Sequence, residues 1–203
     1  MKRCWPLCVV AVLAQWPMLV QPAPVQGQGT EAGRAMSPTS ADPVLAEPLV
    51  HSEGPYGVVH LQQNRVYVFE GRRAVWSAPA GTGTGFRLAG EGQRWTFTTP
   101  RGLFRVIRKE KDPVWEAPDW YFIERGQSVP GDGGSGRLIP GVMGNTAIYL
   151  GDGIAIHGTN NPDRLLDPDP DRRRISHGCI RLTNESAREL FHLLAVGTPV
   201  LIY

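Results

Sequence analysis

One stretch near the end of the chain has the apolar spacing of an amphipathic α-helix, whereas most of the rest is typical of short strands and turns. Asn184 is placed to cap a helix from Glu185 to about Ala195, and Gly197 to end it. Apolar side chains recur there at i, i+3, i+4 and i+7, namely at Ala187, Leu190, Phe191 and Leu194. Runs rich in β-branched and aromatic residues predict strands at 56–61, 65–70, 73–79, 103–108, 146–150, 153–157 and 198–203.

This pattern predicts a mainly β fold with one or two short helices, arranged as in a β-sandwich rather than as a doubly wound sheet. Two segments are expected to be irregular. The glycine-rich segment 81–85 predicts a mobile turn, because no long helix follows it and no βαβ unit surrounds it. The aromatic segment 115–121 lies beside Pro113 and contains Pro118, which favours an irregular surface segment.

The N-terminal part has the composition of an export signal followed by a linker. Lys2 and Arg3 precede an apolar stretch at 9–20, which is shorter than the ~20 residues that a membrane-spanning helix needs. Residues 1–23 are therefore predicted to be a signal peptide or an N-terminal anchor. Residues 24–53, rich in proline, alanine and glycine, are predicted to be a flexible tether, and 54–203 the folded domain. We expect an exported protein of the periplasm or cell envelope, attached to the membrane only if the first segment is retained.

Cysteine usage narrows the chemistry. The chain has three cysteines, and Cys4 and Cys8 fall in the predicted signal. Cys179 is then the one cysteine of the exported part, so no internal disulfide forms there. Its thiol is either buried and inert or reactive.

Charge argues against a nucleic-acid binder. The formal net charge is +2 at pH 7, and the one dense basic run, Arg172 to Arg174, lies beside acids at 167, 169 and 171, so the local charge largely cancels. These acids resemble the start of a calcium loop, but Arg172 stands where that loop needs glycine and Gly178 where it needs glutamate. We interpret 160–174 as an enlarged flap.

The segment 175–182 carries most of the chemical information. An ordinary thiol with a pKa near 8.5 is only ~3% thiolate at pH 7, and a neighbouring imidazole such as that of His177 is the usual means of activating it. Gly178 leaves room for a substrate carbonyl, and backbone amides at Gly178 and Cys179 are placed to hold an oxyanion. Arg181 lies two residues beyond Cys179, on the same face of an extended backbone, where it suits a substrate carboxylate.

A second segment, 154–159, ends an apolar strand with His157 followed by Gly158. A histidine-glycine pair upstream of a Ser-His-Gly-Cys-hydrophobic-Arg block resembles the catalytic domain of the L,D-transpeptidases. Further similarity lies in Thr-Pro-Arg-Gly at 99–102, the aromatic stretch 113–120, Tyr149 and the closing strand. The resemblance runs from about residue 56 to 203 and is specific, because two separated motifs agree.

The resemblance implies that Cys179 is the nucleophile and His157 its general base, with the carbonyl of Gly158 orienting the imidazole. His177 would assist by hydrogen bonding. Sequence distance alone favours His177 as the base, since it is two residues from Cys179 and His157 is 22 away; exchange of each histidine for glutamine separates the two assignments. Four residues are expected to bind substrate: Arg181, Ser176, Gly178 and Tyr149.

The implied activity is that of a peptidoglycan L,D-transpeptidase. Cys179 would form a thioester with a tetrapeptide stem and release D-alanine. An amine of a second stem, or of an exported acceptor protein, would then take the acyl group and cross-link the cell wall. No cofactor or metal is implied, and a monomer is expected.

Three alternatives stay open. Water in place of the amine would make the chain an L,D-carboxypeptidase or endopeptidase. An inert Cys179 would leave a wall-binding module without catalysis. A zinc site from His157, His177 and Cys179 uses proper ligand types, but its spacing matches no common zinc pattern.

Overall fold

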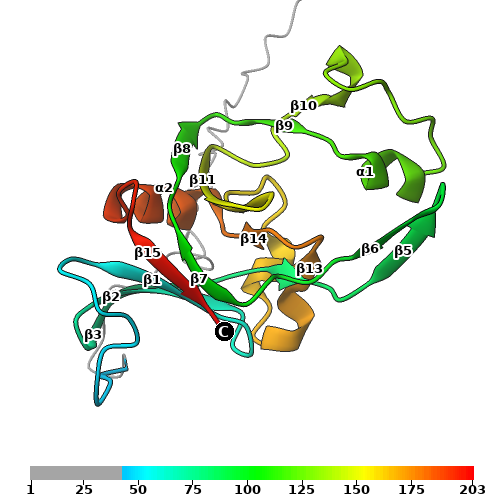
Figure 1. Cartoon of the computed structure of the whole chain (residues 1–203). Coiled ribbons are helices and arrows are strands. Elements are labelled where there is room, and N and C mark those ends of the chain that lie inside the picture. The colour runs from blue at the N-terminus through cyan, green and yellow to red at the C-terminus, as the bar shows by residue number, and fades with distance from the viewer. Residues whose placement is uncertain (1–42) are drawn as a thin grey trace, which may run out of the picture. The chain divides into compact units, whose positions relative to one another are not determined.

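The computed structural model describes residues 43–203 (Figure 1). The predicted signal segment 1–23, and the tether as far as residue 42, lie outside the described residues. No described helix is long and apolar enough to cross a membrane.

Strands dominate the described part of the chain. They are β1 (Tyr56–His60), β2 (Arg65–Glu70), β3 (Arg73–Pro79), β4 (Thr82–Gly83), β5 (Arg87–Gly90), β6 (Gln93–Thr96), β7 (Gly102–Arg105), β8 (Arg108–Lys111), β9 (Val114–Glu116), β10 (Leu138–Pro140), β11 (Thr146–Gly151), β12 (Ile154–His157), β13 (Arg174–Ser176), β14 (Ile180–Arg181) and β15 (Pro199–Ile202). The helices are α1 (Asp119–Glu124) and α2 (Asn184–Leu193), with short 3₁₀ turns η1 (Ser135–Arg137), η2 (Asp163–Leu166) and η3 (Pro170–Arg173).

Two sheets organise the fold, as the sequence predicts. The larger has the order β3-β2-β1-β15-β7, in which β1 and β15 run parallel and the other pairs antiparallel. The smaller has the order β14-β12-β11-β8. Its β12 and β14 run parallel, with His157 opposite Arg181. This pairing brings the segment after residue 153 beside the segment after residue 178, although they are far apart in the sequence.

The main core contains side chains from both sheets and from α2. Val66 and Val200 come from the larger sheet, Ile148 and Ile180 from the smaller one, and Leu190 from α2; all are 0–1% exposed. Each such aliphatic side chain stabilises the fold by roughly 1.5–3 kcal/mol. Helix α2 packs on β11 and β12 (Figure 1). This packing fixes the strands that carry the candidate site.

The predicted capping residue of α2 was wrong. The helix-capping side chain is that of Thr183, not Asn184, because Thr183 Oγ1 accepts a hydrogen bond from the Ser186 amide at 3.2 Å. The helix ends at Leu193, two residues earlier than predicted. Asn184 instead accepts a hydrogen bond from the Asn145 amide and donates one to Asn160 Oδ1.

Both segments expected to be irregular contain regular structure. Pro118 precedes α1 rather than interrupting it; a proline at a helix start loses no helical hydrogen bond, which explains the error. Before it, β9 pairs with β10. In the glycine-rich segment 81–85, β4 pairs with β13, so the first part of this predicted mobile turn is a short buried strand, whereas Thr84 and Gly85 are exposed.

Two further segments pack more closely than the sequence suggests. Residues 43–50, at the end of the predicted tether, lie along β3: Val44 bridges Arg73, and the Leu49 amide donates to Tyr56 Oη at 3.2 Å. The domain boundary at residue 54 remains a prediction. The predicted flap 160–174 is docked on the β1–β2 turn, where Asn64 Nδ2 donates to the Pro170 carbonyl and Arg173 to that of Gln63. Its Leu165 is fully buried, and none of its residues lines the cavity described below.

Candidate active site

A tight loop between β13 and β14 presents Cys179. The fully buried Ser176 shapes it: its hydroxyl accepts from the Gly178 amide at 3.1 Å and donates to the Cys179 carbonyl at 2.6 Å. Thr99 Oγ1 donates to the Gly178 carbonyl at 2.8 Å. Gly178 has φ +131°, which other residues rarely adopt, and a Cβ there would lie 3.3 Å from the Thr98 carbonyl oxygen. The loop conformation is therefore fixed by several hydrogen bonds and requires glycine.

His157 stands at the end of β12 and is only 4% exposed. Its Nδ1 lies 2.6 Å from the Gly158 carbonyl oxygen. Because a carbonyl only accepts, Nδ1 carries the proton, and Nε2 keeps the lone pair that a base needs. A Cβ at position 158 would collide with Asn184 Oδ1, so any larger residue there would have to displace the Asn184 side chain. The ring is oriented by a backbone carbonyl.

Both partners are uncharged in the resting site. Burial lowers the pKa of His157 to about 4, with a smaller lowering from the charge of Arg181, against hydrogen bonds to backbone that raise it. Burial also raises the pKa of the Cys179 thiol, despite opposing effects from a backbone hydrogen bond with Ala155 and from Arg181. The sulfur lies 3.7 Å from the Gly153 carbonyl oxygen. A carbonyl only accepts hydrogen bonds, so this contact suits a protonated, neutral thiol. A thiolate activated in advance, which local sequence reasoning favours, is therefore not the resting form.

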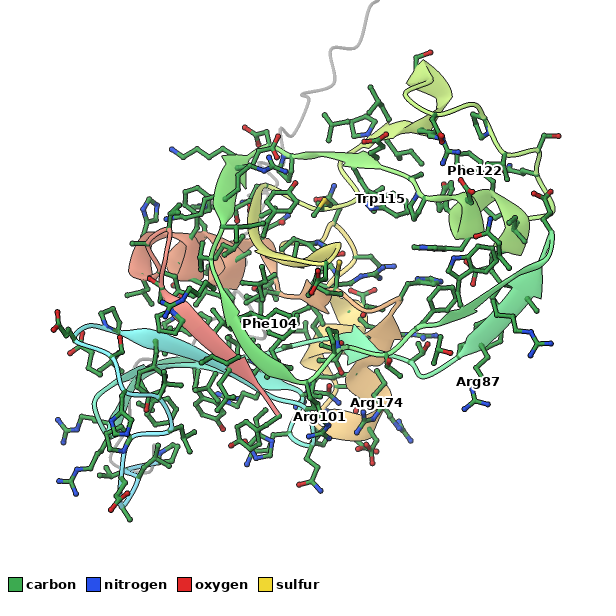
Figure 2. The ribbon with its side chains drawn as sticks, in the orientation of Figure 1. Arg87, Arg101, Phe104, Trp115, Phe122 and Arg174 are labelled. Atoms are coloured by element: carbon green, nitrogen blue, oxygen red, sulfur yellow. The ribbon has the colours of Figure 1, made fainter. Side chains whose placement is uncertain are left out.

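One cavity of about 340 Å³ holds Cys179 and His157 together, with His177 and Arg181 at its wall. The same cavity is also lined by the wall segment, residues 114–125, which contains β9 and α1. It contributes Trp115, Trp120 and Tyr121, among other residues. Figure 2 shows Trp115 on β9 and Phe122 on α1, both in the wall segment. An aromatic wall and a thiol that line one cavity suit a peptide substrate.

Arg181 is half-buried in this cavity, and burial lowers the pKa of its guanidinium. Its Nη1 lies 3.5 Å from the Ile175 carbonyl oxygen. Within residues 43–203 no carboxylate forms an ion pair with it. A partly desolvated cation without an acidic partner is suited to bind an anion.

The other predicted site residues lie at different distances from this cavity. Gly158 and Gly178 flank it through their carbonyl hydrogen bonds. The Ser176 hydroxyl is engaged inside the loop, and Tyr149 packs on the apolar cluster beside Cys179 while its hydroxyl donates to Glu110 at 3.0 Å. Neither of these two lines the cavity, and their contact with substrate stays a prediction.

Sequence reasoning missed two residues that touch His177. Glu124 holds the His177 Nε2 at 3.1 Å from both carboxylate oxygens, and Phe97 packs edge-on against its ring at 4.4 Å between centroids. Both come from segments far from residue 177 in the sequence. Recognising α1 behind Pro118 would have placed Glu124 at a helix end, but not beside this histidine.

Among the described residues, no three histidine, cysteine, aspartate or glutamate side chains gather closely enough to hold a metal ion. A thiol and a neutral imidazole at one cavity are instead the parts of a cysteine acyl-transfer site. The chain belongs to the L,D-transpeptidase catalytic domain family, since the family described as YkuD, L,D-transpeptidase catalytic domain, matches residues 54–202.

Two relatives share about a third of their aligned residues with this chain. The probable L,D-transpeptidase ErfK/SrfK of Salmonella typhimurium is 34% identical over 149 residues, covering 71% of this chain and 43% of that protein. The probable L,D-transpeptidase YbiS of Escherichia coli K12 is 36% identical over 126 residues, covering 60% of this chain and 39% of that protein. The chain thus spans less than half the length of these relatives.

Solved structures have the same fold. The L,D-transpeptidase of Xylanimonas cellulosilytica matches with a TM-score of 0.53 and 22% identity, covering 77% of this chain and 63% of that one. The catalytic domain of the Enterococcus faecium L,D-transpeptidase matches with a TM-score of 0.51 and 23% identity, covering 76% and 100%. At these identities the likeness concerns the fold alone.

Proposed function

We propose that this chain is a peptidoglycan L,D-transpeptidase that works through a Cys179 thioester. The observation that carries the proposal is the shared cavity: it holds the thiol, a neutral imidazole whose Nδ1–H is fixed by the Gly158 carbonyl, and the unpaired Arg181 cation. Membership of the L,D-transpeptidase catalytic domain family supports the substrate class that we propose, a tetrapeptide stem ending in a D-residue.

In the proposed first step, the sulfur attacks the carbonyl of the bond to the terminal D-residue. His157 Nε2 takes the thiol proton as the carbon–sulfur bond forms, and the same imidazolium returns it to the departing amine of D-alanine. The Cys179 amide is the better oxyanion donor, because the Gly178 amide already donates to Ser176. A second amine then attacks the thioester, and the sulfur leaves.

The setting of this activity is also part of the proposal. A charged start followed by a short apolar stretch supports export to the periplasm or cell envelope, and the acceptor is a second stem or an exported protein. A monomer acting without cofactor is sufficient for the chemistry. The membrane enters only if the N-terminal segment is retained.

Incubation of the purified protein with muropeptides, read by mass spectrometry, tests this function. The expected products are free D-alanine and cross-linked dimers. Trimmed monomers without dimers would replace the transferase by the hydrolytic alternative, an L,D-carboxypeptidase or endopeptidase. Absence of any acylated Cys179 would leave the non-catalytic wall-binding alternative.

Exchange of Arg181 for methionine is expected to raise KM for the donor by about 10- to 100-fold, because a charge-assisted hydrogen bond to the donor carboxylate is lost. The sharper readout compares donors with a C-terminal carboxylate and a C-terminal amide. The unmodified protein should discriminate between them, and the variant should not. Equal discrimination by both proteins would show that Arg181 binds no donor carboxylate.

A further inference from the structure

His177 is held on three sides by residues that the reaction described so far does not use. Its ring stacks on Trp120 with centroids 4.3 Å apart and planes 14° from parallel. Phe97, only 3% exposed, meets the ring edge-on. Glu124 binds its Nε2 through both carboxylate oxygens. A side chain held this closely has one orientation.

These contacts also determine which ring nitrogen is available. A carboxylate only accepts hydrogen bonds, so Nε2 carries a proton and donates it to Glu124. In the neutral ring, the lone pair is then on Nδ1. Among the described residues Nδ1 has no hydrogen-bond partner, and the ring lines the cavity that contains Cys179. The arrangement of carboxylate, imidazole and free ring nitrogen is that of an oriented general base.

The two histidines of the cavity differ in position. His157 is 4% exposed, is oriented by a carbonyl, and lines the same cavity as the thiol. The side chains of His177 and Glu124 are 28% and 29% exposed, so this pair is partly accessible from solvent. Acylation needs a base for the thiol proton, and transfer needs a base for the proton of the attacking amine. A partly exposed imidazole with a free ring nitrogen is suited to the second task.

We infer that Glu124 and His177 form a second acid–base pair that serves the acyl acceptor, a primary amine. Glu124 is a positioning residue, and His177 Nδ1 receives the proton of the attacking amine. This inference rests on the proposed function.

In the resulting step, the amine nitrogen bonds to the thioester carbon as its proton passes to His177 Nδ1. The carbon–sulfur bond breaks, and the sulfur leaves with the bonding electrons. The proton on His177 then returns to the sulfur, so thiol and both rings end neutral.

Other charged groups at this cavity are Glu116, Arg125 and Arg181; Arg125 Nη1 lies 3.5 Å from Glu124. Asp119 of α1 faces Arg137 instead.

The test separates acylation from transfer in Glu124→Ala and Glu124→Gln, with Glu91→Gln as control. Glu91 is an exposed acid at the tip of the β5–β6 hairpin. The acyl-enzyme is formed with a tetrapeptide donor, then challenged with glycinamide, and the amide and acid products are counted by mass spectrometry. Glutamine keeps an oxygen that accepts from Nε2–H but lacks the charge, so it distinguishes orientation from electrostatics.

Acylation is expected to stay within about twofold in all variants, whereas the ratio of aminolysis to hydrolysis falls about tenfold or more in Glu124→Ala. Glu124→Gln should fall less, and Glu91→Gln should match the unmodified protein. The pH dependence of aminolysis should change in Glu124→Ala but not in the control. An unchanged ratio in Glu124→Ala overturns the inference, and so does an equal fall in acylation and aminolysis, which marks a structural role. Failure of the unmodified protein to acylate would instead refute the proposed function.

Discussion

Exchange of His157 for glutamine is expected to slow acylation of Cys179 by about 10²- to 10⁴-fold, the usual contribution of a positioned general base. Glutamine still has an N–H for the Gly158 carbonyl, but it has no basic nitrogen for the thiol proton. His177→Gln should leave acylation within a few-fold, because its Nε2 is bound to Glu124 and its proposed role comes after the thioester forms. The measurement is the rate of adduct formation with a tetrapeptide donor or a carbapenem.

The pH dependence of the acylation rate should follow the protonation of the same residue, His157. His157 must be neutral to accept a proton, and its pKa is about 4, lowered chiefly by burial. Acylation should therefore persist well below pH 6.5, the ordinary histidine value, and fall as pH drops through about 4. The unfolded chain takes up that proton near pH 6.5, so stability declines over the same interval, and the folded fraction must be measured in parallel.

The opposite outcome would reverse the assignment. If His157→Gln acylates normally and His177→Gln does not, the base is the histidine nearer in sequence. A fall in the acylation rate of the unmodified protein as the pH drops through 6.5 would also contradict a buried, neutral His157.

Local patterns were enough to predict most of the scaffold. The strands of the larger sheet, β11 and β12 of the smaller sheet, and the apolar face of α2 were predicted from alternation and from the 3.6-residue period, because an element with one buried face has a regular apolar spacing. Strands β8 and β14 of the smaller sheet were not predicted. The predicted helix nevertheless began at the wrong cap, because Thr183 and Asn184 are both good capping residues. Asn184 is required elsewhere, where its side chain binds the Asn145 amide beside Gly158.

What the sequence could not predict depends on contacts between distant segments. Glu124 and His177 are 53 residues apart, and only the packing of α1 against the β13–β14 loop brings them together. The docking of 160–174 likewise depends on the turn at Gln63 and Asn64. The direction of the thiol pKa shift was missed because a neighbouring histidine suggests activation, whereas burial of the sulfur has the larger effect.

Exchange of Cys179 for serine is expected to abolish the thioester and to lower donor turnover by about 10⁶-fold, as loss of a nucleophile does in other acyl-transfer enzymes. Even the native thiol is uncharged at rest, so its proton must move to His157 during attack. A serine hydroxyl is a far weaker acid than a thiol, and a neutral imidazole with a pKa of about 4 is too weak a base to ionise it. Mass spectrometry should show a donor adduct on the native protein and none on the variant.

The uncharged resting thiol has a consequence that the same protein can test. Alkylation by iodoacetamide uses the thiolate without help from substrate, so its rate should be low at pH 7 and rise only above the ordinary thiol value of about 8.5. Donor acylation should already be fast at pH 7, because there the proton passes directly to His157 within the cavity. Rapid alkylation with an inflection near pH 6 would instead reveal a resting thiolate–imidazolium pair, and the neutral proton-transfer mechanism would then be wrong.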